Sequence, residues 1–252
     1  MLLKKLFRLT AIIVHVLWGV VQVFYYIDAK KGIAEKEKKL IKHWFEVFLQ
    51  KLRIEKIVHG EFSSINHLMV SNHVSWMDII VLNSIYETHF IAKSEIRKWP
   101  IVGWLSANTG TLFVKQGSMT AARRLNETIA QLLSTGQCIT LFPEGGTSDG
   151  KQIEKFYPGL FQSALNAQIM VAEAEIVIQP VVISYQHNNQ YSQDIPYIDD
   201  ISLWSNFWTI LGLDKITVDV YFTPKIPVAN KTRKELSHQA LQQMQYVLFD
   251  KP

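Results

Sequence analysis

The chain has 252 residues, 48% of them hydrophobic and 12% aromatic, which is enough to bury a large core and excludes a disordered protein. Lysine and arginine exceed aspartate and glutamate by 26 − 22 = 4, which suits an anionic partner such as phospholipid headgroups, a phosphorylated substrate or nucleic acid. Cys138 is the only cysteine, so no disulfide forms within the chain, and no dense cluster of histidine and cysteine supports a structural zinc site.

The first element is an apolar segment over residues 9–27, LTAIIVHVLWGVVQVFYYI, which contains no charged side chain. Its length is about that of a helix that spans a bilayer. A cleaved signal peptide has a similar basic start, but no small-x-small cleavage site follows, and a buried helix of a soluble domain is the other alternative. Basic residues on both flanks leave the orientation open and permit a helix that lies in one leaflet.

A second helix is predicted just after it, because apolar residues recur at steps of three and four between residues 41 and 52. This stripe either packs onto the main domain or lies at the membrane interface. Residues 1–52 are therefore predicted to be a membrane-attachment unit. The members of the stripe are Ile41, Trp44, Phe45, Phe48, Leu49 and Leu52.

From Ile54 onward, short β-branched runs alternate with stretches of helical length, which predicts an α/β domain over residues 53–252. We expect a mixed, mostly parallel sheet flanked by helices. Ser118 or Thr120 suits the start of one helix and Gly136 its end. Residues 202–212 form either a core helix or another membrane-contacting surface. The expected strands are 54–58, 67–71, 89–92, 111–115, 137–142, 177–184 and 216–222, and the other helices 77–86, 95–106, 119–134, 159–171 and 232–249.

The stretch VSNHVSWMDII places His73 and Asp78 five residues apart at a change from strand to helix. On one continuous helix they would be about 140° apart, so a turn must bend the chain if they are to hydrogen-bond. If paired, Asp78 would fix the imidazole tautomer and leave the other ring nitrogen to take a proton. Ser75 lies between them but lacks the strand–Ser–helix elbow of a nucleophile, and an isolated His-x4-Asp spacing is weak evidence for catalysis.

Two further stretches carry chemistry. In ITLFPEGGTSDG, residues 139–150, Glu144 and two glycines follow a strand, and such a turn either exposes backbone N–H groups to an anion or is an ordinary solvated turn. Between residues 91 and 118, basic residues surround an apolar segment. Either these cations hold a phosphate while the aromatic residues face an acyl chain or the bilayer, or the segment is a solvated basic face. Those residues are Lys93, Arg97, Lys98 and Lys115, around Trp99, Pro100 and Trp104.

Together these stretches resemble the lysophosphatidate acyltransferase family of glycerolipid acyltransferases. The matching blocks occur in the family's order over about residues 70–184: NHVSWMD, KSEIRKWPIVGWLSANTGTLFV, FPEGGTS and VIQPVVIS. The resemblance implies transfer of a fatty acyl group from acyl-CoA or acyl carrier protein to the free hydroxyl of 1-acyl-glycerol-3-phosphate, giving phosphatidate. It implies neither a metal, a cofactor, a covalent acyl-enzyme nor a nucleic-acid partner.

The resemblance also implies roles for individual residues. His73 would be the general base and Asp78 its orienting partner, while Glu144 and Gly145 would help to hold the acceptor. We further expect substrate contacts from Gly146, Thr147, Lys93, Lys115 and Asn72. The expected location is a membrane, with the catalytic domain facing the cytoplasm (the inner membrane if the chain is bacterial).

The chain departs from the family pattern at two places where arginines would clamp the phosphate of the acceptor. Gln116 stands at one, and Gly146 and Thr147 replace a Thr-Arg pair at the other. Substitutes would be Lys115, Lys151, Arg123 or Arg124. Lysophosphatidate is the first expected acceptor, and a lyso-ornithine lipid or another lysophospholipid is the alternative. A non-catalytic lipid-binding or membrane-tethering protein on the same scaffold is the rival of another class.

Overall fold

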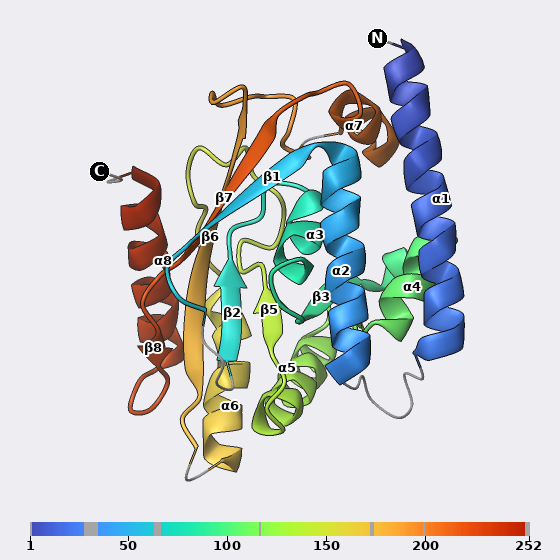
Figure 1. Ribbon diagram of the computed structural model, residues 1–252. Coiled ribbons are helices and arrows are strands. Elements are labelled where there is room, and N and C mark those ends of the chain that lie inside the picture. The colour runs from blue at the N-terminus through green and yellow to red at the C-terminus, as the bar shows by residue number, and fades with distance from the viewer. Residues whose placement is uncertain are drawn as a thin grey trace.

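The computed structural model describes residues 2–27, 35–62, 67–115, 117–171, 174–198 and 200–249. Its centre is an eight-stranded sheet in the order β1-β7-β6-β2-β5-β3-β4, with β8 paired to β6 (Figure 1). Neighbouring strands are parallel except at β6–β7 and β6–β8. The strands are β1 (Ile54–His59), β2 (His67–Ser71), β3 (His89–Lys93), β4 (Leu112–Val114), β5 (Ile139–Leu141), β6 (Val177–His187), β7 (Ile216–Phe222) and β8 (Ile226–Pro227).

Helices cover both faces of the sheet and bury two separate clusters of apolar side chains. One cluster joins the sheet to α2, α3 and α7, and the other joins it to α5, α6 and α8. The helices are α1 (Leu2–Tyr26), α2 (Glu35–Leu52), α3 (Met77–Asn83), η1 (Ser94–Lys98), α4 (Val102–Asn108), α5 (Met119–Ser134), η2 (Pro158–Phe161), α6 (Gln162–Met170), α7 (Leu203–Ile210) and α8 (Arg233–Phe249).

The predicted mixed, mostly parallel α/β sheet is confirmed, and each predicted strand appears within a few residues. One predicted helix is wrong as drawn. Residues 95–106 do not form one helix, because the chain breaks at residues 99–101 into η1 and α4, where Pro100 precedes Ile101 with a φ of 63°. The short strand β8 was not predicted. Residues 202–212 contain α7, which buries Asn206 and Ile210 but leaves Trp204 61% exposed.

Helix α5 shows how local sequence sets the ends of an element. The Ser118 hydroxyl accepts a hydrogen bond from the Ala121 N–H, as expected of an N-cap. At the other end, Gly136 has a φ of 85°, which a side chain would disfavour. The Gln137 N–H then donates to the Leu132 carbonyl at 3.1 Å, closing the Schellman motif that ends the helix.

Helix α1 lies along the domain and is held there by polar contacts as well as by packing. The Arg8 guanidinium donates to the Leu211 and Leu213 carbonyls and pairs with Asp214. Further along, the His15 ring stacks on Trp44 of α2 with centroids 4.7 Å apart. These contacts fix α1 against α7 and α2 over most of its length.

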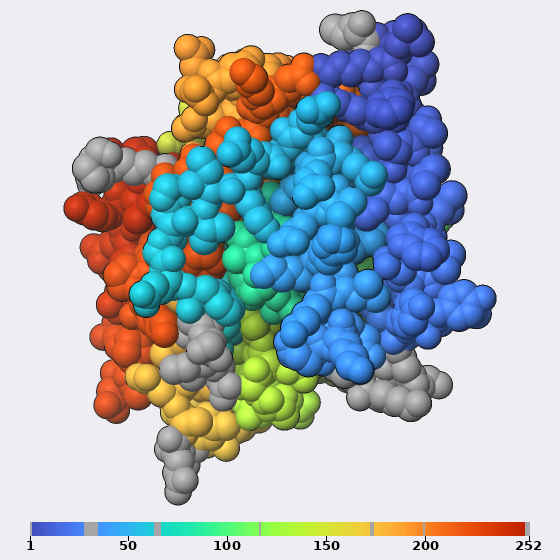
Figure 2. All heavy atoms as spheres, viewed as in Figure 1, coloured from blue at the N-terminus to red at the C-terminus, as the bar shows by residue number. Residues whose placement is uncertain are grey.

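The opposite side of α1 is a continuous apolar surface. Among its most exposed residues are Leu3 at 83%, Phe7 at 76% and Phe24 at 73%. In Figure 2 the dark blue side chains of α1 form one edge of the molecule beside α2. By length and composition α1 could cross a membrane. One side of α1 therefore packs on the protein through Arg8, Ile12, His15, Gly19 and Val23, and the other side presents large apolar residues outward.

Candidate functional site

Asp78 organises the turn between β2 and α3. Its Oδ2 accepts hydrogen bonds from His73 Nδ1 at 2.7 Å, from the Val74 N–H at 2.7 Å and from the Ser75 N–H at 3.0 Å. The chain between the strand and the helix therefore folds back over the carboxylate. This is the bend that the five-residue spacing required, and the predicted pairing of His73 with Asp78 is present. Ser75 contributes its backbone to the turn.

A further donor to Asp78 comes from the centre of the sheet. The Tyr185 hydroxyl on β6 donates to Asp78 Oδ1 at 2.8 Å. Burial and the neighbouring carboxylate hold the pKa of Tyr185 well above its usual range, so the phenol keeps its proton. Asp78 is fully buried, and both of its oxygens have donors. Tyr185 was not among the predicted site residues, because it lies 107 positions from Asp78 and no spacing signals the contact.

Asn72 fixes the start of the same turn. Its Nδ2 donates to the Ile183 carbonyl at 2.9 Å, and its Oδ1 accepts from the Ile183 N–H at 2.7 Å. The side chain thereby continues the pairing of β2 with β6 one residue beyond Ser71, where the backbone turns away. The predicted substrate contact by Asn72 stays a prediction, and the amide it would use is engaged with β6.

The His73 ring is held on a second side by aromatic packing. It stacks on Phe142 with centroids 4.0 Å apart and an interplanar angle of 12°. Because Nδ1 faces Asp78, Nε2 is the nitrogen that points away from the carboxylate. The side chain is 19% exposed, so a substrate atom can reach it. An imidazole held at one nitrogen by a carboxylate is the arrangement that general-base catalysis requires.

Glu144 joins this turn to the loop that follows β5. Its Oε1 accepts from the His73 N–H at 2.8 Å, and its Oε2 accepts from the Glu154 N–H at 2.9 Å. Burial raises the pKa of Glu144 to about 7, although both hydrogen bonds act in the opposite direction. The Ser148 N–H donates back to the His73 carbonyl at 2.7 Å. The backbone of His73 is therefore tied to the loop after β5 by two of these hydrogen bonds, and the third closes that loop on itself.

The glycine turn after Glu144 opens toward solvent on one side. Gly145 has a φ of 80°, and a Cβ there would crowd the Tyr157 ring. A Cβ at Gly146 would meet no atom within 4 Å, so this backbone borders open space. The Thr147 hydroxyl donates to the Tyr197 carbonyl, which ties the loop to residues 190–198. Thr147 thus supplies a neutral, engaged side chain at the position of an expected phosphate clamp.

The predicted lysines lie at the same edge of the sheet but not beside His73. Lys93 ends β3, and Lys115 follows β4; both side chains are exposed. In the strand order they are two and three strands away from β2, which His73 follows. Contacts of these lysines with substrate stay predictions. Gln116, the first departure from the family pattern, lies outside the described residues.

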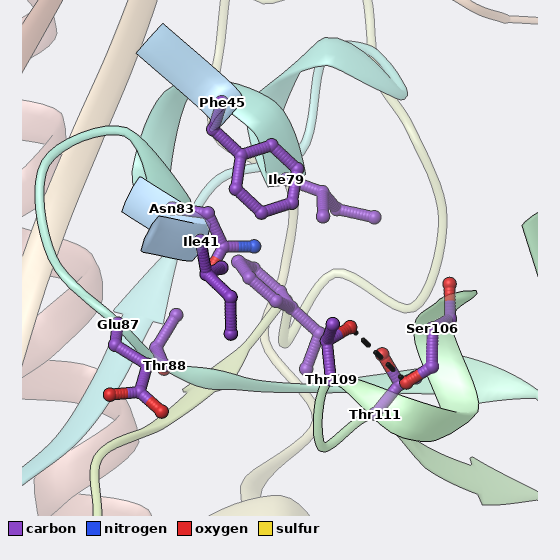
Figure 3. Close-up of a pocket in the computed structure, with 10 residues that line it drawn as sticks. Ile41, Phe45, Ile79, Asn83, Glu87, Thr88, Ser106, Thr109 and Thr111 are labelled. Atoms are coloured by element: carbon purple, nitrogen blue, oxygen red, sulfur yellow. Dashed lines mark hydrogen bonds between the residues drawn. The ribbon is translucent and has the colours of Figure 1, made fainter. Parts of the chain in front are cut away.

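A small cavity lies behind the site, between α2, α3 and the end of α4 (Figure 3). Its volume of about 40 Å³ is sufficient for a few water molecules. Phe90, which neighbours Phe142, forms part of its wall, and the hydroxyl-bearing Ser106, Thr109 and Thr111 form another part. A lipid headgroup or an acyl chain is too large for this volume.

A second His–Asp pair gives a useful comparison. His59 Nε2 lies 2.7 Å from Asp219 Oδ1, and the His59 ring stacks on Tyr221. Strand β1 is parallel to β7, which is antiparallel to β6, and β6 is parallel to β2. Strands β1 and β2 therefore run in opposite directions, and His59, at the end of β1, lies at the opposite edge of the sheet from His73. This pair lies outside the four sequence blocks that carry the family resemblance.

We expect Tyr185→Phe to destabilise the protein by about 1–3 kcal/mol, because it leaves the buried Asp78 Oδ1 without its donor. Denaturant unfolding of the purified chain in detergent measures this. The control is Tyr157→Phe, whose side chain belongs to a 63% exposed residue and whose loss should change the free energy of unfolding by less than about 0.5 kcal/mol. Equal effects of the two variants would contradict the importance of the Tyr185 contact.

The raised pKa of Glu144 makes stability depend on pH. The folded state holds this proton up to about pH 7, whereas an unfolded glutamate loses it near pH 4.5. The contribution of the group is therefore present in full below pH 4.5 and is lost as the pH rises to about 7. We expect the free energy of unfolding of the wild type, minus that of Glu144→Gln, to fall across this window in calorimetry or denaturant titration. A flat or rising difference would contradict the raised pKa.

Comparisons with known proteins identify the family of the chain. The family model described as Acyltransferase matches residues 53–184. A lyso-ornithine lipid O-acyltransferase of Pseudomonas aeruginosa is 34% identical over 212 residues, covering 84% of this chain and 79% of that protein. A 1-acyl-sn-glycerol-3-phosphate acyltransferase of Neisseria gonorrhoeae is 34% identical over 155 residues, covering 62% of this chain and 58% of that protein.

A likeness in three dimensions extends over nearly the whole chain. The crystal structure of PlsC, the 1-acyl-sn-glycerophosphate (LPA) acyltransferase of Thermotoga maritima, superposes with a TM-score of 0.71. It is 20% identical in sequence and covers 99% of this chain and 95% of that one, so the fold is shared. With the family model over 53–184 and the relative from Pseudomonas aeruginosa, the chain belongs to the glycerolipid acyltransferase family and is an acyltransferase.

Proposed function

We propose that the enzyme transfers a fatty acyl group from a thioester, acyl-CoA or acyl carrier protein, to the free hydroxyl of a membrane lysolipid. The observation that carries this proposal is the His73–Asp78 hydrogen bond of 2.7 Å, with the two carboxylate oxygens also accepting from two backbone N–H groups and from Tyr185. Such an imidazole has one defined tautomer. Nδ1 carries the proton toward Asp78, and Nε2 presents its lone pair to the substrate.

In this reaction His73 Nε2 takes the proton of the acceptor hydroxyl as its oxygen attacks the thioester carbonyl. The C–O bond forms, the C–S bond breaks, and the imidazolium returns the proton to the leaving thiolate. Asp78 stabilises the imidazolium between these steps. Glu144 supports the step through the backbone, because its Oε1 holds the His73 N–H in place.

The acceptor is the finer part of the proposal, and the charge of the glycine loop favours a zwitterionic headgroup. Between residues 143 and 151 the one basic side chain is Lys151, which lies 3.9 Å from the carboxylate of Asp149, and Glu144, whose pKa burial raises to about 7, is only partly ionised there. A phosphate monoester carries nearly two negative charges near pH 7 and would find no arginine here. An ornithine headgroup that is acylated on one amine keeps one carboxylate and one ammonium, and so its net charge is near zero.

We therefore place lyso-ornithine lipid ahead of 1-acyl-glycerol-3-phosphate, which the sequence had favoured. The relative from Pseudomonas aeruginosa, whose alignment covers 84% of this chain, is named for the lyso-ornithine acceptor. So is a protein of Rhizobium meliloti that is 33% identical over 221 residues. Lysophosphatidate remains the second candidate, supported by the relative from Neisseria gonorrhoeae.

Residues 1–52 are proposed as the membrane-attachment unit, and the domain of residues 53–252 as the catalytic unit. The outward apolar face of α1 supports attachment, and the contacts of Arg8 and His15 along the domain support a helix lying in one leaflet. Thioester donors of this kind are cytoplasmic, so the catalytic domain is proposed to face the cytoplasm.

Replacing the proposed base tests the function directly. We expect His73→Ala to lower kcat by roughly 10²–10⁴ or more, because the acceptor hydroxyl then lacks a base. His59→Ala is the matched control, since it removes a histidine that is also paired with an aspartate, at 2.7 Å, at the other edge of the sheet. Acyl transfer is followed by mass spectrometry with both acceptors. Undiminished turnover by His73→Ala would overturn the role of His73 as the base, whereas no acyl transfer by the wild type to any lysolipid would favour the non-catalytic lipid-binding alternative.

A second variant tests the acceptor. Thr147→Arg introduces a cation beside Gly146, where the backbone borders open space. We expect the ratio of kcat/KM for lysophosphatidate to that for lyso-ornithine lipid to rise roughly tenfold or more, the value of one charge-assisted hydrogen bond. Thr135→Arg, on the exposed end of α5, is the control. Wild-type enzyme that uses lysophosphatidate more efficiently than lyso-ornithine lipid would overturn the acceptor assignment.

A further inference from the structure

The segment between β3 and β4 carries large apolar side chains that the fold does not bury. Within η1 no residue is buried, and within α4 only Gly103 is. Four large apolar residues of residues 99–104, here called the 99–104 turn, are 40–48% exposed: Trp99, Ile101, Val102 and Trp104. In water such a cluster is unfavourable unless a partner covers it.

The backbone of the 99–104 turn is strained at Ile101, one of these exposed residues. Ile101 has a φ of 63° and a ψ of −62°, and the Val102 N–H donates to the Pro100 carbonyl at 2.6 Å. This is a γ-turn of the rare, strained kind, with a β-branched residue at its centre. The chain can pack closely against η1 at Gly103, because a Cβ there would collide with the carbonyls of Ile96 and Arg97. Strain that the fold maintains at an exposed site points to a role outside the fold.

The charges beside the turn identify the chemistry of the partner. Arg97 and Lys98 end η1 directly before Trp99, and both are exposed. Tryptophan next to basic residues is the composition of segments that lie at the boundary of headgroups and acyl chains in anionic membranes. The acyl chains of an anionic leaflet would contact the apolar 99–104 turn, and its headgroups would contact Arg97 and Lys98.

The position of the turn connects it with α1 and with His73. Helix α4 packs against α1, and both lie at the same side of the molecule (Figure 1). The turn is therefore continuous with the helix whose apolar face we propose to attach to the membrane. The segment also starts at Lys93, the end of β3, at the same edge of the sheet as the turn that holds His73.

We propose that the 99–104 turn inserts into the boundary region of an anionic leaflet as a second membrane contact, which brings the edge of the sheet that bears His73 to the bilayer surface. The inference rests on the proposed membrane attachment by α1 and adds a separate site to it. In the inserted state, the bilayer removes from water the exposed apolar side chains at and around the strained residue Ile101.

Site-specific fluorescence quenching tests the insertion in the full chain. A bimane label is placed on Val102→Cys, and separately on Phe24→Cys of α1 and on Ile169→Cys of α6, which is 81% exposed in the native protein. Burial raises the pKa of the native Cys138 thiol to about 12, so the introduced cysteine reacts selectively. The proteins are bound to vesicles of phosphatidylcholine and phosphatidylglycerol that contain acyl-brominated lipid as the quencher.

We expect quenching at positions 102 and 24 and none at 169. Quenching at 24 without quenching at 102 overturns the insertion of the turn and leaves attachment by α1 intact. Absence of quenching at both overturns the membrane attachment itself. Acyl transfer to detergent-dispersed lysolipid, measured on the same samples, reports separately on the proposed enzyme activity.

Two sets of variants separate membrane contact from a structural role. Ile101→Gly relieves the backbone strain and removes the apolar side chain, so we expect an equal or higher Tm together with weaker vesicle binding. Arg97→Gln with Lys98→Gln should weaken binding about fivefold per charge, only when phosphatidylglycerol is present. The control pair is Arg233→Gln with Lys234→Gln at the exposed start of α8, which should leave vesicle binding unchanged. A lower Tm with unchanged binding in Ile101→Gly overturns the proposal.

Discussion

The buried carboxylate of Asp78 is the constraint on which the geometry of the candidate site depends. An ionised carboxylate without donors would be very costly in the interior. Here the donors come from the His73 ring, from two backbone N–H groups of the turn and from Tyr185 in the central sheet. All of these donors must contact one carboxylate at the same time, which constrains the backbone conformation of the turn between β2 and α3. The orientation of His73 follows from this demand.

The surrounding contacts extend that constraint to the two neighbouring loops. Asn72 anchors the start of the turn on β6, and Glu144 anchors the His73 backbone on the loop after β5. The central strands β6, β2 and β5 thus each hold one side of the turn. Because the strands are parallel there, their carboxyl ends meet at one edge, and residues far apart in the sequence gather without long excursions of the chain.

Much of this fold could be predicted from the sequence, for reasons visible in particular residues. The β-branched run of VIQPVVIS reads as a buried strand, and Ser118 and Gly136 mark the ends of α5 by their capping chemistry. The break between η1 and α4 could not be placed, although Pro100 hints at it. It depends on Ile101 adopting a positive φ, which a β-branched residue avoids unless tertiary structure imposes it.

The site was predictable only in part for a similar reason. The motif residues His73, Asp78 and Glu144 lie in short recognisable blocks, whereas Tyr185 reaches Asp78 across 107 positions. The engagement of Asn72 with Ile183, 111 positions away, is equally invisible to local spacing. Such contacts depend on which distant strands pair, and the hydrophobic periodicity of the sequence does not indicate that pairing.

The polar contacts of α1 bear on how a lipid substrate reaches this site. If α1 crossed the bilayer away from the domain, Arg8 would lose its hydrogen bonds to the Leu211 and Leu213 carbonyls and its pairing with Asp214. Hydrogen bonds to a charged group contribute about 1.5–3 kcal/mol each, and the separated guanidinium would then have to enter lipid. A helix that stays on the domain avoids both costs and still offers its large apolar face to one leaflet. With His73 as the proposed base, such an arrangement would hold its edge of the sheet at a fixed height above that leaflet, so that a lysolipid could present its hydroxyl there while its acyl chain remains in the bilayer.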